Sequence, residues 1–164
     1  MMEPIARLDD EHRVLEGCVA RLECLLTTSH HPFDLRTFAV LLDQLAQRLP
    51  EHLRFEETQF YVPLTALHPA TYEVLQQLMR DHEDLMQTLR QLQELQFEHP
   101  PLAEVALHAY STHFVELYRE HSEREHRCLF PLLEQLPATP LPPADHAPAL
   151  AHAARVPARR LAHR

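Results

Sequence analysis

Apolar residues recur in alternating steps of three and four along the first segment of the chain. The repeat in residues 4–28 consists of Ile5, Leu8, His12, Leu15, Val19, Leu22 and Leu26. Such spacing places these side chains on one face of an α-helix, as in a helix that packs into a bundle. We therefore expect a helix that ends before Pro32 and turns His12 toward the core.

The second helical segment covers about residues 34–67. It opens with Asp34, whose side chain is suited to cap a helix N-terminus. Pro50 and Pro63 lie inside it, so we expect kinks or a break at these positions. Its predicted inward positions are Phe38, Leu42, Leu45, Leu49, His52 and Glu56.

Two further helical segments complete the predicted fold. The third begins at Pro69 and stops before Pro100, and the fourth covers about residues 102–136. Their predicted inward positions are Leu75, Leu78, His82, Leu85, Leu89 and Leu92 in the third, and Leu107, Tyr110, Phe114, Leu117, His121, Glu125 or Arg124, Cys128 and Leu132 in the fourth. Because no segment alternates polar and apolar residues with a period of two, we predict an all-α protein, an antiparallel up-down-up-down four-helix bundle.

The composition changes after residue 136. Residues 137–164 are rich in Pro, Ala, His and Arg and carry no apolar repeat. A segment of this kind buries too little apolar surface to offset the entropy of ordering it. We therefore predict one domain in residues 1–136 and a disordered C-terminal tail in residues 137–164.

Charge and composition exclude several classes of function. The formal net charge is −9, and four arginines oppose one aspartate in the tail, so the bundle itself is strongly acidic. An acidic surface disfavours nucleic acid, and a chain whose single glycine is Gly17 has no glycine-rich phosphate loop. No apolar run approaches the roughly 20 residues that cross a bilayer. We expect neither a nucleic acid nor a membrane as partner.

The cysteines and the first residues bear on location. Three cysteines form no Cys-x-x-Cys pair, and an odd number argues against a disulfide framework. Residues 1–10 lack the basic and apolar regions of a secretory signal. We expect a cytoplasmic protein.

Four histidines, one in each predicted helix, are spaced symmetrically about the predicted turns. They are His12, His52, His82 and His121, and the midpoints of successive pairs fall at residue 32, at residue 67 and between residues 101 and 102. Residues equidistant from a turn face each other in an antiparallel bundle. The four imidazoles should therefore lie at one level.

Two of these histidines are followed by a glutamate one helical turn later, as His52-x-x-x-Glu56 and His121-x-x-x-Glu125. Side chains at i and i+4 share a helix face. A lone histidine on an apolar face is more often a hydrogen-bonded core residue, which leaves a purely structural bundle as an alternative. A buried carboxylate, however, is costly unless it is paired or binds metal. No arginine is predicted on the inward faces of both the second and the fourth helix at the level of Glu56 and Glu125. We interpret the six side chains as the ligands of a two-metal centre.

The ligand chemistry narrows the choice of metal. Imidazole and carboxylate without thiolate suit iron, manganese or zinc, and six protein ligands are too many for one tetrahedral zinc. Two histidines per metal with both glutamates bridging would leave each ion an open position. We predict two iron ions, because iron can use an open position for redox chemistry with O₂ or related molecules.

The order and flanks of these residues resemble those of the hemerythrin-like (HHE cation-binding) proteins. The resemblance spans about residues 5–136 and includes Leu129-Phe130-Pro131 after the last predicted ligand, with Phe60-Tyr61-Val62-Pro63 as a counterpart that has one extra residue. It implies a non-haem di-iron centre with an oxo or hydroxo bridge. It also implies one iron on His12 and His52, the other on His82 and His121, and bridging by Glu56 and Glu125.

One position departs from the oxygen-carrying hemerythrins, which have His-x-x-x-His in the third helix. Here the residue four after His82 is Met86. The resulting set of four histidines and two glutamates is similar to that of iron–sulfur-cluster repair proteins and of hemerythrin-like iron or oxygen sensors. The extra N-terminal cysteine domain usual in the repair proteins does not occur in this sequence.

Other polar residues receive smaller roles. His113 is about 12 Å along the helix from His121, so we expect it to pack beside the centre rather than bind the same metal. Glu16, one turn from His12, could accept a hydrogen bond behind the centre or serve as a spare ligand. Glu123-x-x-His126 is a ferritin-like element, but that site plan needs a second copy and two more glutamates.

Two functions of different class follow from a di-iron centre. The first is a metal-binding protein that binds or senses O₂, NO or iron. The second is a di-iron oxidoreductase acting on peroxide or nitric oxide, or an iron donor in iron–sulfur cluster repair. In either case the expected partner is a small diatomic ligand or peroxide, and protein partners are unknown from the sequence.

Overall fold

The computed structural model describes residues 2–27, 34–96 and 102–135. Its α-helices are α1 (Met2–Thr27), α2 (Leu35–Glu56), α3 (Val62–Leu67), α4 (Tyr72–Leu95), α5 (Leu102–Arg124) and α6 (Phe130–Gln135). Two π-helical segments, η1 (Glu57–Tyr61) and η3 (Glu125–Leu129), and a 3₁₀ turn, η2 (Pro69–Thr71), connect some of them. These three ranges contain no strand.

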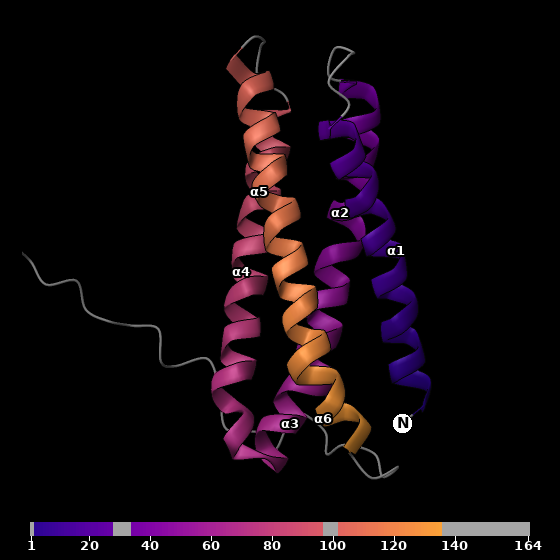
Figure 1. The fold of residues 1–164 in the computed structure, drawn as a ribbon, viewed down its shortest axis with the longest axis vertical. Helices are drawn as coiled ribbons and strands as arrows, with labels where there is room; N and C mark the ends of the chain where they lie inside the picture. The colour runs from indigo at the N-terminus through magenta and orange to yellow at the C-terminus, as the bar shows by residue number, and fades with distance from the viewer. Residues whose placement is uncertain (1, 28–33, 97–101, 136–164) are drawn as a thin grey trace, which may run out of the picture.

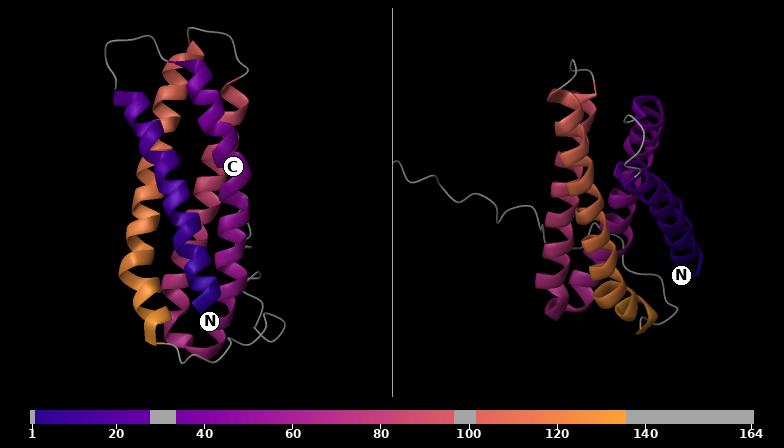
Figure 2. Two further views of the ribbon diagram at one scale, coloured as in Figure 1. Left: turned by 90° about the vertical axis from the view of Figure 1, so that its right-hand side faces the viewer. Right: turned by 45° about the horizontal axis from the view of Figure 1, so that its top comes forward.

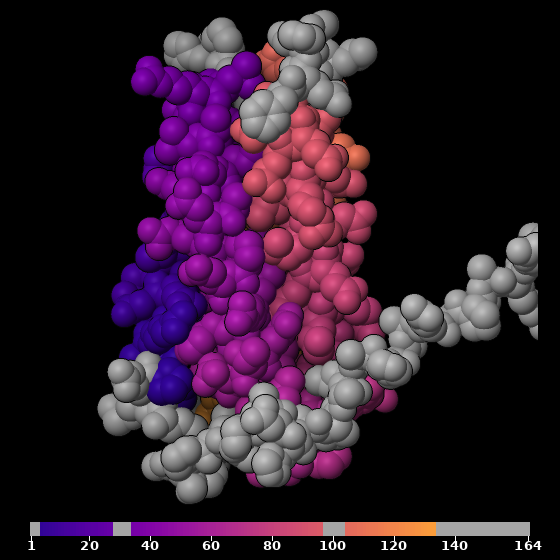
Figure 3. Space-filling model, turned by 180° about the vertical axis from the view of Figure 1, so that it is seen from behind, coloured from indigo at the N-terminus to yellow at the C-terminus, as the bar shows by residue number. Residues whose placement is uncertain are grey.

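The four long helices form an antiparallel bundle (Figure 1). Each packs against two neighbours, in the order α1, α2, α4, α5 and back to α1, and the turned views agree with this ring (Figure 2). Seen from behind, α2 and α4 lie side by side (Figure 3). The segments α3 and η2 join α2 to α4 at the end of the bundle where α6 also lies. The predicted all-α, up-down-up-down fold is confirmed.

The cap predicted at the start of the second helical segment forms, but the interruption expected at Pro50 does not. Asp34 caps α2, since its carboxylate accepts hydrogen bonds from the backbone N–H groups of Arg36 and Thr37 at 3.1 Å each. The hydrogen bonds from Thr37 and Arg36 also lower the pKa of Asp34. The helix continues through Pro50 without interruption, whereas the change from π to α geometry falls just before Pro63.

Two apolar clusters fill the bundle, and the polar layer lies between them. The larger includes Leu89 and reaches Leu85, and the smaller includes Phe60 and Leu78. Along α4 the order is therefore Leu78, His82, Leu85, with the histidine buried between the two clusters. The predicted ligand level is a polar layer enclosed by apolar packing on both sides, where desolvation strengthens electrostatic interactions.

The predicted inward face of the fourth helix is partly wrong. Tyr110 is exposed and Leu117 is only half-buried, while Ser111 and Tyr118 are buried in their place. A strict step of three or four drifts from the 3.6-residue turn, so one wrong step rotates the next positions by about 100°. The sequence left either Glu125 or Arg124 as the inward residue, and the structure buries Glu125.

Two other predictions have different outcomes. The predicted disordered tail, residues 137–164, lies outside the described residues. No helix in the described part of the chain is long and apolar enough to cross a membrane.

Candidate metal centre

The structure brings all six predicted ligand side chains into one buried layer. His12 is 6% exposed and the other three histidines less, while Glu56 and Glu125 are fully buried. Two groups have ligand atoms within 4.8 Å of one another: His12, His52 and Glu56 in one, and Glu56, His82, His121 and Glu125 in the other. Glu56 belongs to both groups and so joins them.

The first group centres on Glu56. Its Oε1 lies 3.0 Å from Nε2 of His12 and 3.2 Å from Nε2 of His52. The two imidazole rings meet edge to face with centroids 4.6 Å apart. Both rings therefore turn the same nitrogen toward one carboxylate oxygen, the arrangement in which a metal ion could replace the protons between them.

The second group repeats this arrangement with one difference. Nε2 of His82 lies 3.3 Å from Oε2 of Glu56, and Nε2 of His121 lies 3.5 Å from Oε2 of Glu125. The rings of His82 and His121 also meet edge to face, at 4.9 Å. However, both nitrogens of His121 and Oε2 of Glu125 are buried without a hydrogen-bond partner of suitable geometry.

These buried atoms without hydrogen-bond partners indicate whether the site suits a metal. A buried polar atom without a partner costs about 1–3 kcal/mol, so a stable core rarely keeps three of them together. The three atoms are the two nitrogens of the His121 imidazole and one oxygen of Glu125. Because a neutral imidazole has a lone pair on one nitrogen, His121 and Glu125 can each offer an electron pair to a divalent cation. The layer therefore has the donor chemistry of a metal site, and its unsatisfied atoms are on the side of His121 and Glu125.

The charges of the metal-free layer support the same interpretation. Burial alone would raise the pKa of Glu56, but hydrogen bonds from His12, His52 and His82 hold it well below the ordinary value. Burial alone would lower the pKa of His12 and of His82, but hydrogen bonds to glutamates raise these to about 10 and about 9. His121 lacks such bonds, and burial lowers its pKa. Protons on His12 and His82 thus occupy positions that a cation could take.

Carboxylates also lie behind three of the imidazoles. On the outer Nδ1 atoms, Glu11 lies 3.2 Å from His52, Glu57 lies 2.8 Å from His82, and Asp81 lies 3.8 Å from His121. A carboxylate at this position orients a ligating histidine and makes it a stronger ligand. Asp81 is also paired with Arg124.

Sequence reasoning missed these three acids. Each is adjacent to a predicted ligand or inward residue: Glu11 precedes His12, Glu57 follows Glu56, and Asp81 precedes His82. Yet each contacts a histidine on a different helix, so only the packing of the helices reveals its partner. The adjacency of an acid to a ligand is a weak signal, because exposed acids are common at such positions.

Tyr61 is a further residue of the layer that the sequence analysis did not select. It is fully buried, and its hydroxyl donates a 2.7 Å hydrogen bond to Oε1 of Glu125. The hydroxyl oxygen of Tyr61 also lies 3.3 Å from Nε2 of His82 and 3.4 Å from Oε2 of Glu56. Burial and the neighbouring carboxylates raise the pKa of Tyr61, so its hydroxyl keeps its proton and donates a hydrogen bond.

The π-helical segment η1 explains why Tyr61 reaches the layer. In an α-helix, residue i+5 lies about 140° around the axis from residue i, off the inward face. A π-helix has i→i+5 hydrogen bonds, which bring Tyr61 back over Glu56. The motif Phe60-Tyr61-Val62-Pro63 was noted in the sequence, but its extra residue does not signal the π-helix, because η3, which leads into Leu129-Phe130-Pro131, is π-helical without it.

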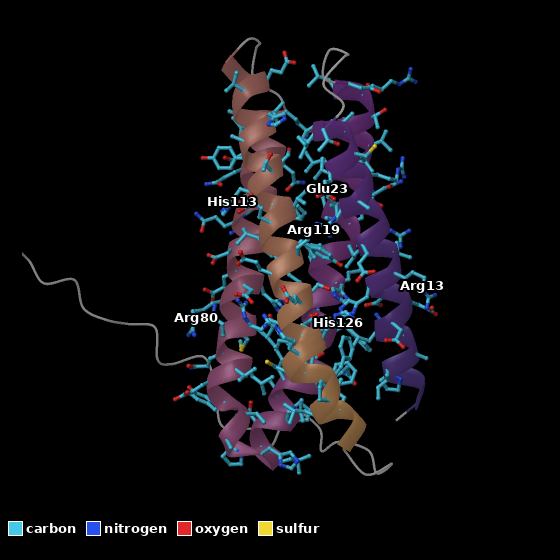
Figure 4. The ribbon with its side chains drawn as sticks, viewed as in Figure 1. Arg13, Glu23, Arg80, His113, Arg119 and His126 are labelled. Carbon is cyan, nitrogen blue, oxygen red and sulfur yellow. The ribbon has the colours of Figure 1, made fainter. Side chains whose placement is uncertain are left out.

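Smaller expectations from the sequence have mixed outcomes. His113 is exposed and lies away from the layer (Figure 4), so the prediction that it packs beside the centre is wrong. Its position faces solvent because the inward face of α5 runs through Phe114 and Tyr118. Glu16 is exposed, and no hydrogen bond links it to His12 in the described part of the chain.

Two large hollows reach the layer from opposite sides, and a small one of about 70 Å³ has His52 in its wall. The α1 hollow, about 550 Å³, lies between α1 and the η3–α6 segment and has His12 in its wall. The α4 hollow, about 500 Å³, lies between α2 and α4 and has His82 and Met86 in its wall. Met86, where the oxygen carriers have a histidine, thus lines an approach to His82.

Comparison with known proteins identifies the family. The family model described as the hemerythrin HHE cation-binding domain matches residues 3–133. Neither the curated proteins nor the solved structures yield a match. The matched range covers the whole four-helix bundle, including all six side chains of the buried layer. The chain therefore belongs to the hemerythrin HHE cation-binding domain family.

Proposed function

We propose that this protein holds a non-haem di-iron centre and uses it to bind or sense O₂, NO or iron. His12, His52 and Glu56 would hold one iron, and His82, His121 and Glu125 the other, with both glutamates bridging. The observation that carries the proposal is the set of buried, unsatisfied donor atoms on His121 and Glu125 beside a carboxylate shared by both groups. The metals would supply reversible one-electron redox chemistry.

The residues of the chain have distinct tasks in this proposal. The acids Glu11 and Glu57 orient the imidazoles of His52 and His82 from behind. Asp81 lies 3.8 Å from Nδ1 of His121 and is paired with Arg124. The apolar clusters on either side keep bulk water out of the layer and strengthen its electrostatic interactions. Tyr61 holds a proton on its hydroxyl and fixes the orientation of Glu125.

A second candidate is a di-iron oxidoreductase acting on peroxide or nitric oxide, or an iron donor for cluster repair. Tyr61 favours the enzyme, because its hydroxyl is a hydrogen-bond donor within the layer that could bind and orient a peroxide there. Met86 also favours the enzyme. It stands where the oxygen carriers have a second third-helix histidine, so the iron held by His82 and His121 would have no third imidazole ligand.

Two experiments test these functions. Anaerobic addition of Fe²⁺ to metal-free protein without a His tag should give two irons per chain, and fewer than one would support a structural bundle instead. Rapid mixing of the reduced protein with O₂, peroxide and NO then separates the candidates. A stable, reversible spectral change indicates a binder or sensor, whereas sustained consumption of the added molecule indicates an enzyme.

A further inference from the structure

The α1 hollow ends on the one imidazole that is held differently from the others. His52, His82 and His121 each have a carboxylate within 3.8 Å of Nδ1. No carboxylate among the described residues lies within ion-pair distance of Nδ1 of His12. The side chain of His12 is nine-tenths buried and is also the most exposed of the four imidazoles, at 8%. Its Nε2 is held by Glu56 and Glu125, at 3.0 and 3.3 Å, whereas its outer nitrogen has no carboxylate beside it.

The rim of the α1 hollow carries negative charge. Asp9 and Glu16 line it, and neither forms an ion pair within the described part of the chain. The arginine at the rim, Arg13, is paired with Asp10 at 2.8 Å. A hollow with unpaired acids and a neutralised arginine attracts cations.

His126 gives the hollow a nitrogen ligand. Its Nδ1 lies 2.8 Å from the backbone carbonyl oxygen of Ser122, and a carbonyl only accepts, so Nδ1 carries the hydrogen. The neutral ring therefore keeps its lone pair on Nε2, the form that binds a metal. The ring stacks toward His12 with centroids 6.5 Å apart, on the side of η3 that faces α1 (Figure 4).

We propose that a divalent cation reaches the buried layer through the α1 hollow, docking first on Glu16 and His126 and then passing to His12. This inference rests on the proposed di-iron function and adds the route by which metal enters. His126 is near enough to His12 for a short transfer. His12 is the predicted ligand in the wall of this hollow, so it is the first of the six that an entering ion would meet.

The α4 hollow is the obvious competing route and is less suited to a cation. Arg54, Arg90 and Glu83 line it without an ion-pair partner in the residues that the structure describes, so its unpaired charge is net positive. The imidazole at its base, His82, is fixed by the 2.8 Å contact between Nδ1 and Glu57. Free arginines repel Fe²⁺, so this side does not favour metal entry.

The test measures how fast the full-length metal-free protein takes up Fe²⁺ under anaerobic conditions. Stopped-flow mixing with Fe²⁺, quenched with a strong chelator, gives the rate, and metal analysis at equilibrium gives the amount. The test variant is the double substitution Glu16→Gln and His126→Gln. The matched control is Glu83→Gln, an exposed acid at the α4 hollow. All three residues are exposed, so the variants should fold as the wild type does, which circular dichroism checks.

We expect the double variant to load about tenfold more slowly, in the range by which charged clefts raise association rates. Its final iron content should equal that of the wild type, and the control should load at the wild-type rate. An unchanged loading rate in the double variant would overturn the route. Reduced final iron would also overturn it, since Glu16 or His126 would then belong to the centre itself. Wild type that binds no iron refutes the proposed function instead.

Discussion

The α1–α2 pair and the α4–α5 pair each supply two imidazoles and one glutamate, but the metal-free protein satisfies these groups to different extents. Glu56 of the first pair lies within 3.3 Å of three imidazoles. Glu125 of the second pair accepts a hydrogen bond from Tyr61 at one oxygen, and its other oxygen lies 3.3 Å from Nε2 of His12 and 3.5 Å from Nε2 of His121 without good hydrogen-bond geometry. The equivalent of Tyr61 after Glu125 is Phe130, which has no polar group to donate.

The difference shows how one layer can serve both the stability of the fold and the binding of a metal. The contacts of Glu56 form without a metal, so they stabilise the metal-free core. The unsatisfied atoms of His121 and Glu125 destabilise the metal-free core, and a bound cation would relieve that cost. The two pairs should therefore respond differently to mutation in the metal-free protein and similarly in the metal-bound protein.

The largest effect is expected on metal retention. Glu56→Ala and Glu125→Ala should each remove most of the iron, because each deletes a predicted bridging ligand. A metal that binds only the native state stabilises it by about 4 kcal/mol when the free metal concentration is a thousand times Kd, and a variant that cannot bind the metal loses this stabilisation. Metal analysis and thermal melts of the iron-loaded proteins check this. Full iron content and an unchanged melt in both variants would refute the bridging assignment.

The next effect should separate the two pairs in the metal-free protein. Glu56→Ala should lower the free energy of unfolding by about 3 kcal/mol, since three buried imidazoles lose their acceptor. Glu125→Ala should cost clearly less, because it also removes an unsatisfied buried oxygen. Urea unfolding of both apoproteins measures the difference. Equal losses would contradict the proposed asymmetry.

Tyr61 offers a smaller test of the same asymmetry. Tyr61→Phe should destabilise the metal-free protein by about 1.5–3 kcal/mol, the usual range for a hydrogen bond to a charged group. Tyr118→Phe is the matched control, since Tyr118 is also buried but makes no hydrogen bond to the layer. Urea unfolding again gives the values, and a loss no larger than that of the control would show that the hydroxyl contributes nothing.

The smallest effect concerns protons. The raised pKa values of His12 and His82, about 10 and about 9, mean that the native apoprotein holds protons more tightly than the unfolded chain. Their contribution to stability is complete below the unfolded pKa of about 6.5 and is lost as the pH rises toward 9–10.

Metal must displace these protons. Adding Fe²⁺ at pH 7.5 in weak buffer should therefore release about two protons per chain. A pH indicator dye or calorimetry in two buffers measures them. Iron binding without proton release would show that His12 and His82 are not ligands.

The fold and the buried layer could be predicted because both follow α-helical periodicity. His82 stands in line with Leu78 and Leu85, and the same regular spacing places the other three histidines at one level. Tyr61 was missed because it depends on a π-helical segment, which the 3.6-residue period does not describe. Glu57 was missed because its partner, His82, is on another helix, and contacts between helices depend on rotation about each axis rather than on spacing in the sequence.

The separation of the two irons tests the central claim most directly. X-ray absorption on protein loaded with two irons should show an iron–iron vector of about 3.5–4 Å, the usual separation in two-metal sites. Mössbauer spectra of the same sample should show a magnetically coupled pair. Two isolated irons with no such vector, or iron bound outside the layer, would contradict the account.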